Sequence, residues 1–249
     1  MSRRRFYAPP GAMIDSCIDL SKGETHHLVR VLRMKAGDEA FVFDGCGAEY
    51  RCRFVAMSNN CARLEIVETL GSEVESPARI TLAQALAKGE RFDLVVQKAT
   101  ELGVSSIVPL VTEHTDVKLA EESSQRRLER WRRVSLEAIK QCGRRRLVEI
   151  SSPLTPEQFC DSSAGRFEAV LLFSERGGEL LASALKGVSG SREIAALIGS
   201  EGGWSDDELE LLASRGAKPV TLGPRVLRTE TAAIVAVTLL QHALGDLSR

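Results

Sequence analysis

The sequence predicts an α/β protein in two parts, a small β-barrel followed by a parallel sheet that helices cover on both faces. Two observations predict this fold class. In the first seventy of the 249 residues, several segments alternate apolar and polar side chains, which is the period of half-buried strands. Further along, wholly apolar runs alternate with amphipathic segments, the pattern of parallel strands buried between helices.

The first part of the chain has turn signals between its alternating segments. Glycine and asparagine, the residues of tight turns, gather at 44–47 and 58–60. A short helix is predicted over 25–33, where Leu28, Val31 and Leu32 share a face. Together these features predict a small β-barrel with one helical insert. The alternating segments are 40–44, 49–55 and 62–67.

A linker is predicted at 71–77, which divides the chain into a barrel domain, residues 1–72, and a parallel-sheet domain, residues 73–249. Within the second domain, Ser205 and Glu208 have the spacing of a capping box, which marks the start of a helix. The candidate strands are 80–86, 106–110, 169–173, 194–198 and 219–222. The candidate helices are 91–102, 122–142, 178–185, 206–214 and 231–244.

The composition is that of an ordinary globular protein, with 43% hydrophobic residues, 27% charged residues and a net charge of −1. The longest apolar run, 232–240, falls short of the ~20 residues that span a bilayer, so no membrane partner is expected. Residues 1–10 are basic without an apolar stretch behind them, which excludes a secretory signal and favours the cytoplasm. The six cysteines form no C-x-x-C pair and the four histidines stand at no zinc-ligand spacing, so no metal is expected.

Two glycine-containing turns, 197–205 and 222–231, follow two late candidate strands. Ligands of open α/β sheets bind at the carboxyl ends of the strands, and glycines let the backbone approach a flat ligand. The chain has neither G-x-x-x-x-G-K-[ST] nor G-x-G-x-x-G, and the acidic residues of the first turn would repel a pyrophosphate. S-adenosylmethionine, with an adenine and a cationic centre but no phosphate, is compatible. The acidic residues are Glu201, Asp206, Asp207 and Glu208.

Both turns can also be explained as structural connections between strands and helices. The second turn is harder to explain in this way, because Arg225, Arg228 and Glu230 lie next to a very apolar helix. Charged residues usually avoid such places unless they are paired or functional.

Basic residues are concentrated between Arg126 and Arg146, where nine Lys or Arg accompany two Glu. A solvated helix face is the usual explanation of a charge run, but so few acids allow little salt-bridge pairing. Contact with nucleic-acid phosphates is therefore favoured, above all at 144–146. A second basic patch at 3–5 is followed by Phe6 and Tyr7, aromatic rings that can stack on bases.

The two turns resemble a known family. Ile198-Gly-Ser-Glu-Gly-Gly-Trp-Ser-Asp-Asp-Glu208 and Leu222-Gly-Pro-Arg-Val-Leu-Arg-Thr-Glu-Thr-Ala232 are similar to the RsmE family of ribosomal RNA uridine methyltransferases, in the SPOUT superfamily. The family commonly has proline where Ser200 stands and isoleucine where Val226 stands, and neither departure adds charge or bulk. Further similar segments are 27–33, 84–89, 97–104 and 137–144.

The resemblance implies a PUA-like β-barrel and a SPOUT domain, whose parallel sheet is covered by helices and contains a trefoil knot. It also implies S-adenosylmethionine as the cofactor, a homodimer, and methylation of N3 of a uridine in the 16S rRNA of the small ribosomal subunit. By position, the implied cofactor-binding residues are Ser174, Leu197, Gly199, Glu201, Gly202, Leu222, Gly223, Leu227 and Arg228.

N3 of uracil must lose its proton before or during methyl transfer, and a nearby cation favours the resulting anion. Arg228 is the first candidate for this role and Arg225 the second. Glu230 is a candidate proton acceptor, although a structural ion pair explains it at least as well. The candidate RNA contacts are Arg3, Arg4, Arg5, Arg30, Arg33, Arg144, Arg145 and Arg146.

Two other functions stay open. A non-catalytic rRNA-binding assembly factor on the same scaffold would explain the basic segments, but it would not need both glycine turns. A dinucleotide-dependent enzyme is disfavoured by the missing glycine fingerprint and the acidic first turn.

Overall fold

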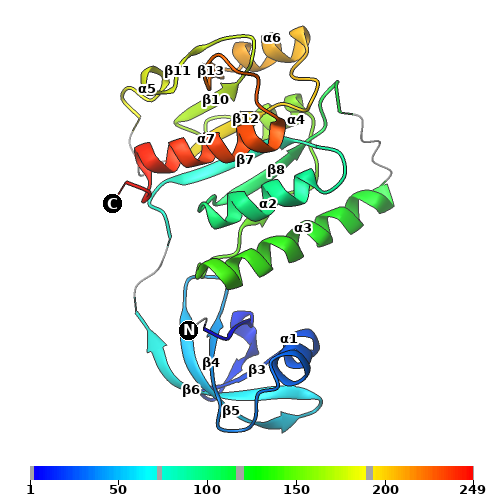
Figure 1. Ribbon diagram of the computed structural model, residues 1–249, viewed down its shortest axis with the longest axis vertical. Helices are drawn as coiled ribbons and strands as arrows, with labels where there is room; N and C mark the ends of the chain where they lie inside the picture. Colours follow the sequence, from blue (N-terminus) through cyan, green and yellow to red (C-terminus); the bar gives the residue numbers. More distant parts are fainter. Residues whose placement is uncertain (1–2, 72–74, 116–120, 189–192, 249) are drawn as a thin grey trace. The chain divides into compact units, whose positions relative to one another are not determined.

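The computed structural model describes residues 3–71, 75–115, 121–188 and 193–248, which form two compact units (Figure 1). Unit 1 contains Met1–Glu75 together with Ile139–Leu147, and unit 2 contains Ser76–Ala138 and Val148–Arg249. The predicted boundary between residues 72 and 73, and residues 72–74 of the predicted linker, lie outside the described residues. No sequence signal predicted that a segment from the middle of the chain joins unit 1.

Unit 1 is built on a six-stranded, barrel-like sheet, as predicted. The strands lie in the order β1 (Arg5–Tyr7), β4 (Glu39–Phe43), β5 (Glu49–Ser58), β6 (Cys61–Leu70), β3 (Cys17–Asp19) and β2 (Met13–Ile14). Of the strand pairs that the structure describes in this sheet, β1–β4 is parallel and the others are antiparallel. The predicted helix is a short α1 (Lys22–His26) that continues as a π-helical turn, His27–Val31.

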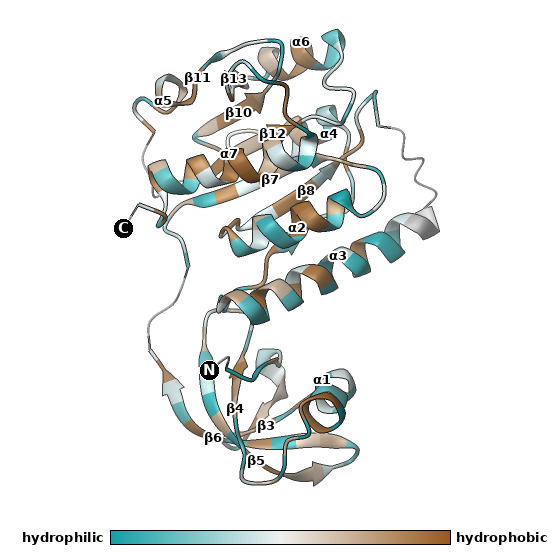
Figure 2. Ribbon diagram, in the orientation of Figure 1, coloured by the Kyte–Doolittle hydropathy of each residue, from teal (hydrophilic) through white to brown (hydrophobic). Residues whose placement is uncertain are grey.

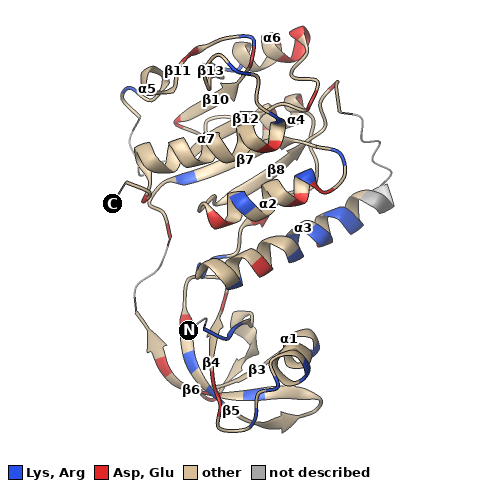
Figure 3. Cartoon of the chain, in the orientation of Figure 1, with Lys and Arg blue, Asp and Glu red and all other residues tan. Residues whose placement is uncertain are grey.

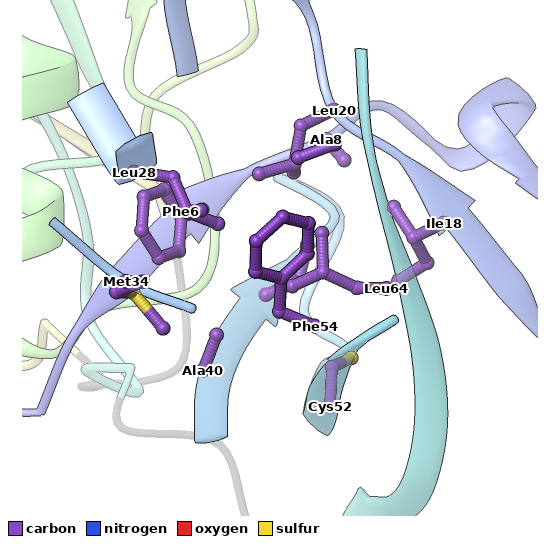
Figure 4. Close-up of a cluster of buried hydrophobic side chains, with 12 residues drawn as sticks. Phe6, Ala8, Ile18, Leu20, Leu28, Met34, Ala40, Cys52, Phe54 and Leu64 are labelled. Atoms are coloured by element: carbon purple, nitrogen blue, oxygen red, sulfur yellow. The ribbon is translucent and has the colours of Figure 1, made fainter. Parts of the chain in front are cut away.

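The alternating pattern of these strands places one set of side chains inside the barrel. Phe6, Leu28, Phe54 and Leu64 are buried there with smaller apolar residues (Figure 4). The β5–β6 hairpin closes at the predicted 58–60 turn, where both asparagines adopt positive φ angles. Asparagine tolerates this left-handed backbone, which matches the twist of a tight hairpin.

A cluster of buried charges closes unit 1. Glu49 lies between two arginines, with Oε1 accepting a hydrogen bond from Arg5 Nε at 2.7 Å and Oε2 lying 3.0 Å from Arg145 Nη2. All three side chains are at most 7% exposed. The Arg5 guanidinium also donates to the carbonyl oxygens of Ile139 and Arg144, each at 2.8 Å.

Two further pairs join the 139–147 segment to the first part of the chain. Arg144 donates to Glu75 at 2.8 Å, and Lys140 pairs with Glu24. Buried charges are costly unless they are paired, so these acids and the cationic segment require one another.

Unit 2 contains a seven-stranded, parallel sheet (Figure 1). Its order is β11 (Glu179–Leu180), β13 (Lys218–Thr221), β10 (Ala169–Phe173), β12 (Glu193–Ile198), β7 (Arg79–Ala85), β8 (Ser106–Leu110) and β9 (Glu149–Ile150). The helices are α2 (Arg91–Glu101), α3 (Glu121–Cys142, which belongs to unit 1 from Ile139 on), α4 (Pro156–Ser162), α5 (Leu181–Ala184), α6 (Asp206–Ser214) and α7 (Thr229–Leu244). The five predicted strands are confirmed to within a residue at each end.

The strands β7, β8, β10 and β12 are buried on both faces, as their apolar sequences predict. Every residue of 194–198 is at most 2% exposed, and the strands are among the most hydrophobic parts of the chain (Figure 2). Phe159 of α4 and Leu212 of α6 join one core cluster with the sheet, while α7 contacts β7 and β12. The fold class is thus confirmed, and the knotted threading of the chain stays a prediction.

One predicted element of unit 2 is wrong, and one helix was not predicted. The helix expected over 178–185 is the short edge strand β11 followed by the four-residue α5. Residues Glu179 and Leu180 extend because they pair with Val220 and Thr221 at the sheet edge. Helix α4 was not predicted, although Thr155 and Gln158 form a capping box at its start. The predicted Ser205–Glu208 capping box is confirmed.

Two cysteines differ in burial, and this difference predicts different reactivity of their thiols. Cys52 is fully buried in the barrel, and this burial raises the pKa of its thiol to about 12, whereas Cys46 is exposed. Because the thiolate is the reactive form, iodoacetamide should label Cys46 in the native protein and Cys52 only after unfolding. Peptide mass spectrometry with and without urea measures both, and equal labelling of the two in the native state would contradict the prediction.

Candidate active site

A cavity lies at the carboxyl ends of three adjacent parallel strands, β13, β10 and β12. Its empty volume is about 480 Å³, including the part open to solvent. Ligands of open α/β sheets bind at this edge of the sheet. The wall residues come from the three loops and the start of α7: Phe173, Ser174, Glu175, Ile198, Gly199, Ser200, Gly203, Leu222, Gly223, Arg225, Leu227, Thr229 and Ala232.

The left-handed backbone and close packing of the first loop favour glycine. Gly203 has φ +71°, and a Cβ atom at this position would lie 2.5 Å from Glu175 Oε1. A Cβ atom on Gly199 would lie 3.1 Å from the indole nitrogen of Trp204. Trp204 is 1% exposed and donates to the Phe173 carbonyl oxygen at 3.1 Å, so it fastens this loop to the end of β10. The first turn is therefore a tightly built wall of the cavity.

A chain of hydrogen bonds joins the two glycine turns. Gln84 Nε2, at the end of β7, donates to Thr229 Oγ1 at 2.9 Å. Thr229 Oγ1 in turn donates to the Gly199 carbonyl oxygen at 2.6 Å. Gln84 and Thr229 are buried, and both Thr229 and the partly buried Gly199 line the cavity. The structure therefore brings together the two turns that the sequence singled out.

Several residues predicted to bind the cofactor lie on the cavity wall. They come from the ends of all three strands, which the sequence could not place side by side. They are Ser174, Gly199, Leu222, Gly223 and Leu227.

The other predicted cofactor residues lie off the wall. Leu197 is fully buried in the core, so only its backbone could reach a ligand. Glu201 accepts a hydrogen bond from Arg91, and Gly202 packs against His114. Arg228 is exposed at the N-cap of α7.

The sequence analysis missed several wall residues, among them Glu175, Ser200 and Thr229. Each is within one to three residues of a predicted position, so a wider window around the motifs would have included them. The pairing of Thr229 with Gly199 needed the fold, because 30 residues separate them.

The three catalytic candidates have different surroundings. Arg225 is exposed and lines the cavity, whereas the exposed Arg228 is not part of its wall. Glu230 is half-buried in the first turn of α7, and its Oε2 is buried without a hydrogen-bond partner among the described residues. The structure thus favours Arg225 over Arg228 as the cation nearest to a bound ligand.

The predicted RNA contacts in the N-terminal patch need correction. Arg5 is 8% exposed and forms a buried ion pair with Glu49, and Phe6 is fully buried in the barrel core. Neither can reach a nucleic acid, because the barrel needs both for its own packing and charge balance. Arg3, Arg4, Arg30 and Arg33 are exposed and stay candidates.

The same correction applies to the 144–146 segment. Arg144 and Arg145 are each 5% exposed, and they form ion pairs with Glu75 and Glu49, respectively. Their charges therefore have a structural role inside unit 1. Arg146 is exposed and stays a candidate. Upstream, α3 carries further exposed arginines, the blue band along this helix in Figure 3.

Within the described ranges, no helix is long and apolar enough to cross a membrane. In the same residues, no three His, Cys, Asp or Glu side chains gather where a metal ion could be held.

Comparison with protein families defines the class of protein. Residues 74–241 match an RNA methyltransferase domain, and residues 20–67 match an RNA methyltransferase PUA domain. The PUA match falls on unit 1, and the methyltransferase match includes the whole cavity wall.

Individual relatives narrow this class. The ribosomal RNA small subunit methyltransferase E of Synechocystis sp. is 36% identical over 241 residues, which cover 96% of this chain and 78% of that protein. The protein of the same name from Aquifex aeolicus is 33% identical and covers 90% of this chain and 93% of its own length. This chain belongs to the ribosomal RNA small subunit methyltransferase E family, as the sequence motifs indicated.

Solved structures of similar proteins match the fold of this chain over nearly its full length. The ribosomal RNA small subunit methyltransferase E of Neisseria gonorrhoeae, bound to S-adenosylmethionine, matches with a TM-score of 0.87 and 30% identity, covering 98% of this chain and 99% of its own. A Legionella pneumophila structure in complex with the same cofactor has a TM-score of 0.91 and 35% identity, covering 99% and 100%.

Proposed function

We propose that the protein transfers the methyl group of S-adenosylmethionine to N3 of a uridine in the 16S rRNA of the small ribosomal subunit. The observation that carries this proposal is the cavity formed by the loops after β10, β12 and β13 in a chain of this family. The proposal includes a cytoplasmic homodimer as the active form and the assembled subunit as substrate.

The cavity residues fit the cofactor. Gly199, Gly203 and Gly223 line the cavity with backbone, and a Cβ atom on Gly223 would meet no other atom within 4 Å, so this part of the wall leaves space for a flat adenine. The apolar side chains of Leu222 and Leu227 provide contact surface for the adenine ring. Bound there, S-adenosylmethionine supplies an electrophilic methyl group on a sulfonium.

The chain itself supplies orientation and charge. In-line displacement at the methyl carbon gains much of its rate from holding the two reactants together. We assign stabilisation of the developing N3 anion to Arg225, on the cavity wall, and orientation of the base to Arg228. Glu230 Oε2, which accepts no hydrogen bond from any described residue, is the candidate acceptor for the N3 proton, directly or through a water molecule.

Loss of either arginine tests this assignment. Arg225→Ala and Arg228→Ala should each lower kcat by about 10²- to 10³-fold, the usual effect of removing one transition-state charge stabiliser. Nucleoside mass spectrometry of rRNA from cells lacking the protein should show loss of a single N3-methyluridine, which the wild type restores and these variants restore poorly.

Arg215→Ala is the matched control, because Arg215 is a half-exposed arginine paired with Asp161, remote from the cavity. If N3-methyluridine persists in cells lacking the protein, the proposed reaction is wrong. A non-catalytic assembly factor would not need the cavity; a calorimetric titration that shows no S-adenosylmethionine binding would favour it.

A further inference from the structure

A larger groove lies beside the cofactor cavity, between α2 and α3. Its empty volume is about 1370 Å³, including the part open to solvent. Lys88 and Arg91 line it from the loop after β7 and the start of α2, Leu94 from the outer face of α2, and Arg130 and Val134 from α3. We call this surface the α2–α3 groove. Its lining combines three cations and two acids, Glu90 and Asp93, with apolar side chains, and none of these residues lines the cofactor cavity.

The groove and the cavity share one loop. Glu201 Oε1 accepts hydrogen bonds from Arg91 Nη1 at 2.8 Å and from the Lys88 backbone N–H at 3.3 Å. The neighbours of Glu201 in this loop, Ser200 and Gly203, line the cofactor cavity. One loop therefore forms part of the cofactor cavity wall and also contacts residues that line the α2–α3 groove.

Arginines continue the charge of the groove along α3. The Arg91 and Arg130 side chains are 45% and 49% exposed, although they pair with Glu201 and Asp93. Arg126 and Arg133, spaced four and three residues from Arg130, are exposed and share its face of the helix. A guanidinium has five N–H donors, so one carboxylate leaves donors for a phosphate.

We propose that the α2–α3 groove binds the RNA strand next to the target uridine, with Arg91 and Arg130 on its phosphates and Leu94 and Val134 against its bases. This inference rests on the proposed function. The nucleotides flanking a reacting base are covalently attached to it, so they must occupy surface that adjoins the cofactor cavity. Single-stranded RNA is bound by grooves whose cations follow its phosphate backbone, and apolar side chains there can contact the faces of the bases.

Glu201 acts in this arrangement as a competitor for Arg91. A phosphate that binds Arg91 replaces the carboxylate contact, so Arg91 is held in place until the strand arrives. Removing the charge of Glu201 should therefore tighten RNA binding, whereas removing Arg91 should weaken it. If the Arg91–Glu201 pair only stabilised the loop, removing either side chain should weaken RNA binding.

The test measures binding of a short, uridine-containing single-stranded RNA by fluorescence anisotropy over a range of KCl concentrations. The double variant Arg91→Ala/Arg130→Ala should bind at least tenfold more weakly. Its log–log salt slope should be smaller by roughly 1.4, because each phosphate of a single strand that is no longer neutralised by an arginine lowers the slope by about 0.7. Arg215→Ala should bind like the wild type, and Glu201→Gln should bind more tightly.

Calorimetric measurement of S-adenosylmethionine binding by the double variant distinguishes a failure of the groove proposal from a failure of the proposed function. Unchanged RNA affinity and salt slope in the double variant, in a protein that does methylate rRNA, would overturn the groove alone. Weaker RNA binding by Glu201→Gln would also overturn it, because the pair would then be structural. A wild-type protein that does not bind the cofactor would overturn the proposed function instead.

Discussion

Replacing Glu49 by alanine is expected to lower the free energy of unfolding by about 3–5 kcal/mol, because removing one member of a buried charge cluster leaves the others uncompensated. Glu49 is 3% exposed at its side chain and contacts both Arg5 and Arg145, which are nearly as buried. Without it, two guanidinium groups stay in the protein interior with no carboxylate between them. Urea unfolding followed by circular dichroism measures the change.

The matched control is Glu39→Ala. Glu39 pairs with Arg51 at 3.1 Å on the same sheet, but its side chain is 53% exposed. Exposed ion pairs contribute about 0–1 kcal/mol, so this change should be close to neutral. Equal effects of the two substitutions would show that the buried cluster does not stabilise unit 1.

Thr229→Val is expected to weaken S-adenosylmethionine binding by about tenfold and to lower the free energy of unfolding by about 1–3 kcal/mol. Valine keeps the shape of threonine but removes the hydroxyl that joins Gln84 to the Gly199 carbonyl oxygen. A buried polar group left without its partner costs about this much. The Gly199 loop, which forms part of the cofactor cavity, would lose its connection to α7.

Thr238→Val is the control for this experiment, because Thr238 lies on the same helix and its hydroxyl bonds to the Ile234 carbonyl oxygen at 2.7 Å, within the helix itself. Calorimetric titration and urea unfolding of both variants give the comparison. Wild-type cofactor affinity in Thr229→Val would show that the hydrogen-bond chain does not shape the cavity.

The regular elements of unit 2 could be predicted because their sequences are self-consistent. The strand at 106–110 and the helix at 206–214 match the structure residue for residue, since apolar runs, helical periodicity and a capping box all agree there. The prediction for 178–185 failed because pairing at the sheet edge, a long-range interaction, overrides its helical pattern.

The candidate site was predicted in part for a similar reason. The two glycine turns carry local signals that singled them out, and the family resemblance then implied Gly199, Leu222 and Gly223, which line the cavity. The structural role of the buried arginines was not predicted, because their acidic partners are distant in the sequence. Glu49 is 44 residues from Arg5, and Glu75 is 69 residues from Arg144. The number of charges along the chain cannot distinguish an exposed cation from one that is neutralised inside the fold.

The buried Glu49 cluster has a consequence for how the protein is made. Arg145 and the carbonyl groups that accept hydrogen bonds from Arg5 belong to the 139–147 segment. This segment leaves the ribosome long after the strands that carry Arg5 and Glu49. The N-terminal unit therefore acquires its last charge partners only when about 147 residues have been synthesised. Until then the nascent chain must keep Arg5 and Glu49 hydrated, and a gene fragment that stops at residue 75 encodes an unfinished domain.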